Sequence, residues 1–234
     1  MSKHKQPKSK GNPQTSAKKS GGMIWAGLLA VIIVVAGSLW YVTSNQSEAD
    51  APAPRALASD VEVPGEWGIG NPDAKLRLVE FGDYQCGACG FYHNIVKEVM
   101  EEYADDVYFV WHHFPLVNTH QFAVMAASAA EAAGRQGKFW EMHDKIMRNQ
   151  QMWSRGMAST SFLNYARELG LDDEQFMRDV RDEAILERIE TQYNLGLSLN
   201  IRSVPSFFIN GEFVSMPQTV DGFKAVLEAH LAEL

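Results

Sequence analysis

Two short, almost wholly apolar segments separated by an amphipathic helix constrain the fold of this chain more than any other feature. Residues 75–81 (KLRLVEF) and residues 107–113 (VYFVWHH) have the composition of strands that are covered on both faces. Between them, apolar residues recur at helical spacing and charged residues fill the opposite face; the apolar ones are Phe91, Ile95, Val96, Val99, Met100 and Tyr103. This β-α-β order predicts two parallel strands joined by a right-handed crossover.

After the second strand the sequence becomes helical. Apolar residues at helical spacing occur in residues 120–133, 139–147 and 162–169 and in a last stretch from about 173 to 197. Asp172-Asp-Glu-Gln175 resembles a capping box at the start of that stretch. Two strand-like segments then flank Asn210-Gly211, a favoured type I′ hairpin dipeptide, and a closing helix runs from about residue 219 to 231. We therefore expect an α/β sheet with a helical insertion at about residues 118–200.

The only two cysteines, Cys86 and Cys89, form a C-x-x-C motif directly after the first predicted strand, where the helix begins. Free backbone N–H groups and the helix dipole stabilise a thiolate at that position. Cys86 is therefore predicted to be a nucleophile with a pKa of roughly 4–7. Cys89, one turn further in and more buried, is placed to attack the first sulfur and resolve a mixed disulfide. The pattern indicates thiol–disulfide chemistry, with no cofactor and no metal.

Three other interpretations of the cysteine pair remain. A zinc site needs two more ligands, and the seven histidines show no pair at the spacing of a zinc finger. A structural disulfide between residues so close in sequence closes a very small loop and stabilises little. The third interpretation is chance spacing of two core cysteines.

Two stretches of the sequence resemble a known family. Residues 78–89 (LVEFGDYQCGAC) and 203–211 (SVPSFFING), together with the inserted helices, are similar to the DsbA family of thioredoxin-fold thiol–disulfide oxidoreductases. The resemblance covers about residues 66–234. It departs from the family at Gly87-Ala88, where proline often comes first, and at Ser203, where glycine is common.

The resemblance implies roles for four residues. Cys86 is the nucleophile, Cys89 the resolving thiol, and Pro205 a cis proline that faces the two sulfurs, preceded by the apolar Val204. It also implies that the Cys86–Cys89 disulfide is donated to cysteine-containing exported proteins and restored by a quinone-linked membrane protein of the DsbB or VKOR-like kind. Two alternatives stay open: a thiol reductase or isomerase of the same fold, and a C-x-x-C metal-binding module.

Glu80 is a further candidate for the catalytic site. It shares one face of a buried strand with Leu76 and Leu78, so its carboxyl group has apolar neighbours. An unpaired carboxyl group there has a raised pKa and can take the proton of Cys89. Members of the DsbA family carry a buried acid at this place, six residues before the first cysteine. The alternative is a glutamate at a strand end that reaches solvent or pairs with a lysine.

The N-terminal part of the sequence has a different character. Residues 1–22 contain six lysines, no acidic residue and almost no apolar side chains, which predicts a disordered basic tail. Met23–Val42 contains no charge, and as a helix it is about 30 Å long, the thickness of a bilayer's hydrocarbon core. Aromatic residues lie near both of its ends. The segment predicts one transmembrane signal anchor, and residues 43–65, rich in Ala, Pro and Ser, predict a linker.

Charge sets the expected orientation and excludes one class of partner. The lysines of the tail should remain in the cytoplasm, so the domain at 66–234 is expected outside it, in the periplasm or on the outer surface. A cleaved signal peptide is the alternative, but the apolar run is longer than a signal peptide needs. Beyond residue 22 the chain has 15 basic and 29 acidic residues. This excess of negative charge argues against nucleic-acid binding.

Overall fold

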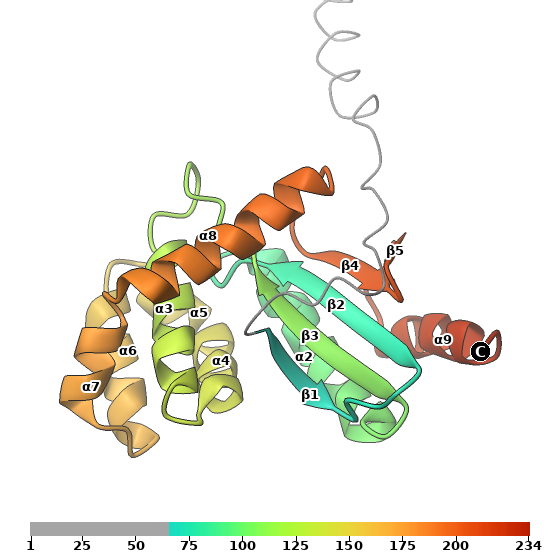
Figure 1. The fold of residues 1–234 in the computed structure, drawn as a ribbon, viewed down its shortest axis with the longest axis horizontal. Coiled ribbons are helices and arrows are strands. Elements are labelled where there is room, and N and C mark those ends of the chain that lie inside the picture. The colour runs from blue at the N-terminus through green and yellow to red at the C-terminus, as the bar shows by residue number, and fades with distance from the viewer. Residues whose placement is uncertain (1–65) are drawn as a thin grey trace, which may run out of the picture. The chain divides into compact units, whose positions relative to one another are not determined.

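The computed structural model describes residues 66–234 (Figure 1). The predicted basic tail, membrane-spanning segment and linker, residues 1–65, lie outside the described residues. Within residues 66–234, no helix combines the length and the apolar character that crossing a bilayer requires.

A mixed sheet of five strands forms the centre of the described domain. The strands lie in the order β1 (Trp67–Gly70), β3 (Val107–His113), β2 (Leu76–Gly82), β4 (Ser206–Ile209) and β5 (Glu212–Val214). The two apolar segments of the sequence, β2 and β3, pair in parallel, as predicted. The other three pairings are antiparallel. β2 thus has a strand on each side, and nearly all of its residues are buried.

Helix α2 (Gly87–Tyr103) connects β2 to β3 and packs with α9 (Val220–Leu231) against the sheet (Figure 1). The apolar side chains between them include Leu76, Leu78, Val96, Val99, Phe109, Phe207, Phe223 and Leu227. The predicted helix is confirmed, but its predicted apolar face is wrong at Phe91, which is 50% exposed. The buried stripe runs through Cys89, Tyr92 and Val96, and Phe91 lies beside this stripe.

The turn between β4 and β5 is the hairpin that the sequence predicted. Asn210 and Gly211 both have positive φ angles, 46° and 88°. A type I′ turn requires this conformation at both central residues, and asparagine and glycine adopt it at low cost.

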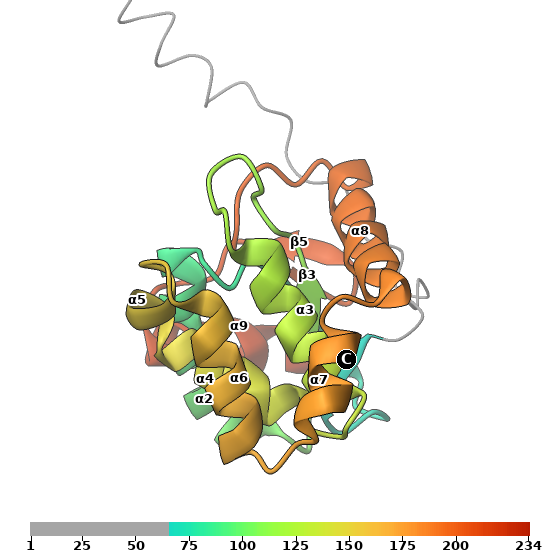
Figure 2. The same cartoon turned by 90° about the vertical axis from the view of Figure 1, so that its left-hand side faces the viewer.

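Six helices lie between β3 and β4: α3 (Ala123–Gly134), α4 (Phe139–Arg148), α5 (Gln150–Trp153), α6 (Ala158–Glu168), α7 (Asp173–Asp179) and α8 (Glu183–Ser198). α3 to α7 gather at one side of the sheet, and α8 extends from them back toward it (Figure 1). Figure 2 shows α3 in the middle of this group. α3 contacts α4, α6, α7 and α8, and its alanines are buried almost all round, which allows these helices to approach closely.

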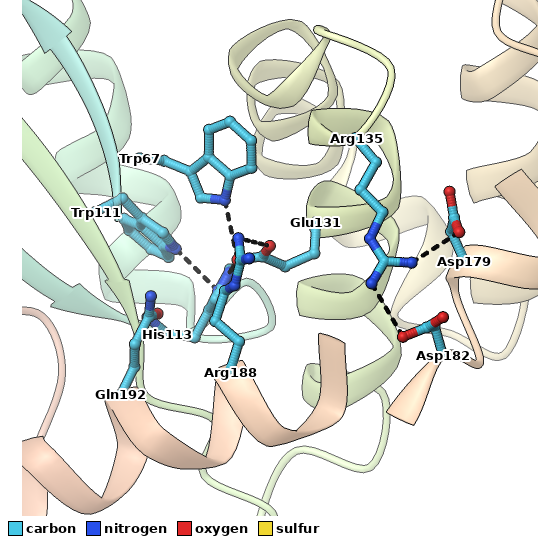
Figure 3. Close-up of polar contacts among 9 residues, drawn as sticks. All are labelled: Trp67, Trp111, His113, Glu131, Arg135, Asp179, Asp182, Arg188 and Gln192. Carbon is cyan, nitrogen blue, oxygen red and sulfur yellow. Dashed lines mark hydrogen bonds and ion pairs between the residues drawn. The ribbon is translucent and has the colours of Figure 1, made fainter. Parts of the chain in front are cut away.

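The sequence predicted one helix from about 173 to 197, and the structure divides it into α7 and α8. Asp172 caps α7 by accepting a hydrogen bond from the Gln175 N–H at 2.7 Å, and Asp182 caps α8 in the same way. The guanidinium group of Arg135 lies 2.8 Å from Asp179 and 3.0 Å from Asp182 (Figure 3). The second cap and this shared cation account for a break that apolar spacing alone does not reveal.

A buried carboxylate joins the helical insertion to the sheet (Figure 3). Glu131 of α3 is 1% exposed and accepts hydrogen bonds from Trp67 of β1 at 2.9 Å and from Arg188 of α8 at 3.1 Å. The Nε2 of His113 lies 3.1 Å from the same carboxylate, and its Nδ1 accepts from the Trp111 indole. Because Nδ1 is the acceptor, Nε2 carries the proton and donates a hydrogen bond to Glu131.

Replacing this carboxylate should weaken the fold. We expect Glu131→Gln to lower the free energy of unfolding by about 3 kcal/mol, because it removes the buried negative charge that Arg188 faces. Glu141→Gln is the matched control: Glu141 pairs with Lys138 at 2.6 Å on the surface, so its loss should cost less than about 1 kcal/mol. Urea unfolding of the two variants measures both values, and equal losses would contradict this account of Glu131.

Candidate active site

Cys86 lies at the boundary between β2 and α2. It is the N-cap residue of α2, with extended backbone angles, and no side chain caps the helix. Its side chain is half-buried, and its Sγ lies 3.6 Å from the carbonyl oxygen of Val204. The peptide bond between Val204 and Pro205 is cis, as the resemblance implied. The structure thus brings together three residues that the sequence analysis singled out.

The surroundings of Cys86 favour its thiolate. A hydrogen bond from the Cys89 thiol, together with the backbone N–H groups of Cys89 and Ala88, lowers the pKa of Cys86 from 9.0 to about 6. Partial burial and the negative charge of Asp83 oppose this shift. The value lies within the range expected for a cysteine at a helix N-terminus.

Cys89 has the opposite environment. Its side chain has no exposed surface, and its Sγ accepts a hydrogen bond from the Asp83 N–H at 3.4 Å. Burial raises its pKa well above the ordinary value, and the hydrogen bond to Cys86 and the charge of Glu80 raise it further. Both cysteines are free thiols in the structure, which is therefore that of the reduced form. The two sulfurs differ in access and acidity, as a nucleophile and a resolving thiol must.

Glu80 lies in β2, the central strand of the sheet. Its side chain is 2% exposed, and its Oε1 has no hydrogen-bond partner within residues 66–234. Burial, and secondarily the charge of Cys86, raise the pKa of Glu80 well above its usual range. Glu80 does not reach solvent, which was the alternative placement. A buried carboxyl group of raised pKa close to Cys89 can exchange a proton with it.

Two further residues shape the site, Asp83 and Gln150, and neither was predicted from the sequence. Asp83 has a buried carboxylate that accepts from the N–H groups of Gln85 at 2.7 Å and Leu116 at 2.8 Å. The first is the bond of an Asx turn, so an aspartate two residues before Gln85 was a usable signal. Gln150 of α5 donates from its Nε2 to the carbonyl oxygens of Tyr84 and Cys86, at 2.7 and 2.8 Å. No local pattern marks a glutamine 64 residues from its partner.

The adjacent histidines His112 and His113 do not share a site. His112 and His113 lie on opposite faces of β3, as adjacent residues of a strand do: His112 stacks on Phe81, and His113 bonds to Glu131. Within residues 66–234, no group of three or more His, Cys, Asp and Glu side chains is arranged to hold a metal ion.

The fold and the site agree with the comparisons to known proteins. The family model described as "Thioredoxin" matches residues 62–229, and the chain belongs to that family. Its architecture is that of the DsbA-type thiol–disulfide oxidoreductases, the class that the sequence resemblance predicted. The fold is therefore the thioredoxin fold, and the free cysteine pair where β2 meets α2 supplies the groups that thiol–disulfide exchange requires.

Three solved structures illustrate the similarity. A thioredoxin-like oxidoreductase from Silicibacter pomeroyi is 27% identical, with a TM-score of 0.60 over 71% of this chain and 92% of that one. Oxidised BdbD from Bacillus subtilis is 23% identical, with a TM-score of 0.64 over 76% and 99%. α-DsbA1 from Wolbachia pipientis is 17% identical, with a TM-score of 0.65 over 75% and 96%.

The chain is also similar in sequence to part of several longer curated proteins. A protein of Mycobacterium sp. strain KMS named Na(+)/H(+) antiporter NhaA 1 is 34% identical over 212 residues, which is 89% of this chain. The chain spans about a third of the length of that relative, 33%. The antiporter name describes those longer proteins.

The lowered pKa of Cys86 can be measured directly. Thiolate absorbance of the reduced protein at 240 nm should fall on acidification, with a midpoint at about pH 6. The signal should disappear in Cys86→Ala. In Cys89→Ala the midpoint should move up, because the Cys89 thiol is the strongest of the groups that lower this pKa. An unchanged midpoint in Cys89→Ala would contradict the geometry.

The same shift links stability to pH. The pKa of Cys86 is about 6 in the folded protein and about 9 for an ordinary thiol, so its contribution to stability is present at high pH and is lost as the pH falls through 6. Reduced wild-type protein should therefore lose more stability between pH 8.5 and pH 5 than reduced Cys86→Ser does. Chemical unfolding at the two pH values measures this difference, and equal losses would refute it.

Proposed function

We propose that this protein donates the Cys86–Cys89 disulfide to cysteine-containing exported proteins. The observation that carries the proposal is the contrast between the two sulfurs: a half-exposed Cys86 with a pKa of about 6 and a fully buried Cys89 with a raised pKa. An accessible sulfur is the one that a substrate thiolate reaches, and a buried thiol close to it serves for internal exchange.

The exchange proceeds in two steps. A substrate thiolate attacks the Sγ of Cys86 in the oxidised protein, the Cys86–Cys89 bond breaks, and Cys89 leaves with the electron pair and takes up a proton. A second substrate thiolate then attacks the substrate sulfur, and Cys86 leaves as a thiolate. The substrate loses two electrons and gains a disulfide, and the protein becomes a dithiol. Glu80 supplies the proton for Cys89 and takes it back on reoxidation.

Val204 and Pro205 border the attacked sulfur. The Val204 carbonyl oxygen lies 3.6 Å from the Sγ of Cys86, so a polypeptide attached to that sulfur lies against these two residues. We assign them the role of positioning the substrate chain beside Cys86.

The direction of electron flow follows from the acidity of Cys86. A stabilised thiolate stabilises the reduced form and makes the disulfide oxidising, so we expect a potential of about −200 to −120 mV. A value at or below about −270 mV would favour the reductase or isomerase of the same fold instead. Equilibration of the pair with glutathione buffers measures it. The metal-binding alternative predicts metal bound to the purified reduced protein.

Trapping tests the division of labour between the sulfurs. Cys89→Ala should accumulate mixed disulfides with exported cysteine-containing proteins, because its nucleophile remains and no internal thiol resolves the adduct. Cys86→Ala should trap almost nothing, because its remaining thiol is buried. Adducts are counted on non-reducing gels and should disappear with dithiothreitol. Equal trapping by both variants, or by neither, would show that Cys86 is not the nucleophile.

The proposal places the domain outside the cytoplasm, held by Met23–Val42 in the cell membrane as a single-pass anchor. A quinone-linked membrane protein of the DsbB or VKOR-like kind would restore the disulfide there, since the dithiol that remains after each turnover needs a two-electron acceptor. This arrangement is supported by the uncharged length of the segment and by the lysines that precede it.

Cell fractionation tests the anchor. The protein should remain with membranes after alkaline carbonate extraction. External protease should release an active domain by cutting within residues 43–65, because the redox pair lies wholly within the domain that follows. A soluble mature form that begins near Ala51 or Ser59 would show instead that a signal peptide is cleaved.

A further inference from the structure

A cavity of about 540 Å³ lies between α2, α4 and the sheet. This volume is in the range of sites that hold small organic molecules. Its apolar wall is formed by Ile69, Val96, Met100, Phe109, Trp111 and Trp140. The proposed exchange of disulfides uses none of these side chains, yet the cavity reaches the centre of the domain.

The aromatic part of the wall is held in place. The Trp140 indole donates to the Gly68 carbonyl oxygen at 3.0 Å, and its ring centre lies 5.7 Å from that of Phe109. The ring of His143 packs 4.8 Å from Trp111, and its Nδ1 lies 2.9 Å from the hydroxyl of Tyr84. A wall of fixed flat rings favours a flat aromatic guest over a flexible one, since less ordering is required on binding.

Glu80 gives the cavity one unsatisfied polar group. It lines the cavity, is 2% exposed, and its Oε1 has no hydrogen-bond partner within residues 66–234. A buried acceptor without a partner costs free energy, which a guest with one donor recovers. A guest without a donor leaves that cost in place.

The charges of the rim exclude ionic guests. Asp144 lies 3.0 Å from the Nζ of Lys97, so these two charges are paired, and it also lies 3.0 Å from the Nε2 of His93, whose pKa burial lowers. Glu101 adds negative charge at the rim and disfavours an anion, whereas Glu141 is paired with Lys138. Burial holds Glu80 toward its neutral form, which disfavours a cation in the interior.

We infer that this cavity is a binding site for a small, neutral, flat aromatic molecule that carries one hydrogen-bond donor, with Glu80 as the acceptor and Trp140 and Trp111 as the wall. The site goes beyond the proposed disulfide donation. Because Glu80 also interacts electrostatically with the two cysteines, a guest bound to it competes for the proton-carrying group of that reaction.

Indole and 1-methylindole are matched probes for this site, since they share the ring system and differ in the N–H donor. The reduced full-length protein should bind indole with a dissociation constant about tenfold lower than that for 1-methylindole. This is the difference expected because 1-methylindole cannot donate a hydrogen bond to the buried acceptor. The measurement follows the side-chain N–H signals of Trp140 and Trp111 in ¹⁵N–¹H spectra. Equal affinities, or no movement of these signals at millimolar indole, would overturn the inference and leave the cavity as a space for solvent.

Two variants distinguish the contribution of the hydrogen bond to Glu80 from that of the cavity volume. Glu80→Leu should abolish the preference for indole, and Val96→Phe, which fills the cavity from α2, should abolish binding of both probes. Val117→Phe is the matched control on an exposed residue and should bind as the wild type does. Binding that survives Val96→Phe would place the indoles elsewhere and refute the site. If Glu80→Leu does not fold, the comparison of the two probes on wild-type protein decides alone.

The proposed function is tested separately, by exchange of the wild-type protein with glutathione in the absence of indole. If the protein binds indole at Trp140 but exchanges no disulfide, the binding site is supported and the proposed function is refuted. If the protein exchanges disulfides but shows no preference between indole and 1-methylindole, the proposed function is supported and the binding site is refuted.

Discussion

The two pairings of β2 position everything else in the site. Parallel pairing with β3 requires α2 as the crossover, so a helix N-terminus begins where β2 ends, and Cys86 is there. Antiparallel pairing with β4 sets Phe81 opposite Ser206, which brings Pro205 to the same end of β2. Strands on both sides and helices above bury Glu80 in the middle of the sheet. One central strand therefore determines the access of the nucleophile, its neighbour across the sheet and the buried acid.

The helical insertion is attached to this sheet by polar groups as well as by apolar packing. Glu131 bonds to residues of β1, β3 and α8 (Figure 3). A buried carboxylate that lacks one of its partners is strongly destabilising, so these bonds favour the arrangement in which all three elements meet. Gln150 reaches from α5 to the backbone of the loop that carries Cys86. These contacts are directional, so they orient the insertion over the reactive end of the sheet where apolar contacts alone would leave its rotation less defined.

The chemistry depends on a difference in solvation between groups that are close together. Cys86 meets backbone N–H groups and solvent, which stabilise its negative charge, whereas Cys89 and Glu80 are enclosed and remain protonated more readily. The charge of Cys86 raises the pKa values of Glu80 and Cys89, and the charge of Glu80 raises that of Cys89, so ionisation of Cys86 discourages ionisation of the two buried groups. A molecule that binds in the cavity beside Glu80 would therefore also affect the ionisation of Glu80 and, through it, of the cysteines.

Local patterns in the sequence were sufficient for the β-α-β unit, the Asn210-Gly211 hairpin and the two cysteines at a helix start, because each depends on residues near one another in the chain. The resemblance of two motifs was sufficient for the fold family. The exposure of Phe91 and the short helix α5 were decided by packing, which apolar spacing does not encode. The break between α7 and α8 was decided by the cap at Asp182 and the ion pairs of Arg135. The contact of Cys86 with Val204, 118 residues away, and the bonds of Gln150 and Glu131 exist only once the sheet has closed. Spacing along the chain records which residues share a face, but burial and the partner of a buried polar group depend on segments distant in sequence, and these are set by the tertiary structure alone.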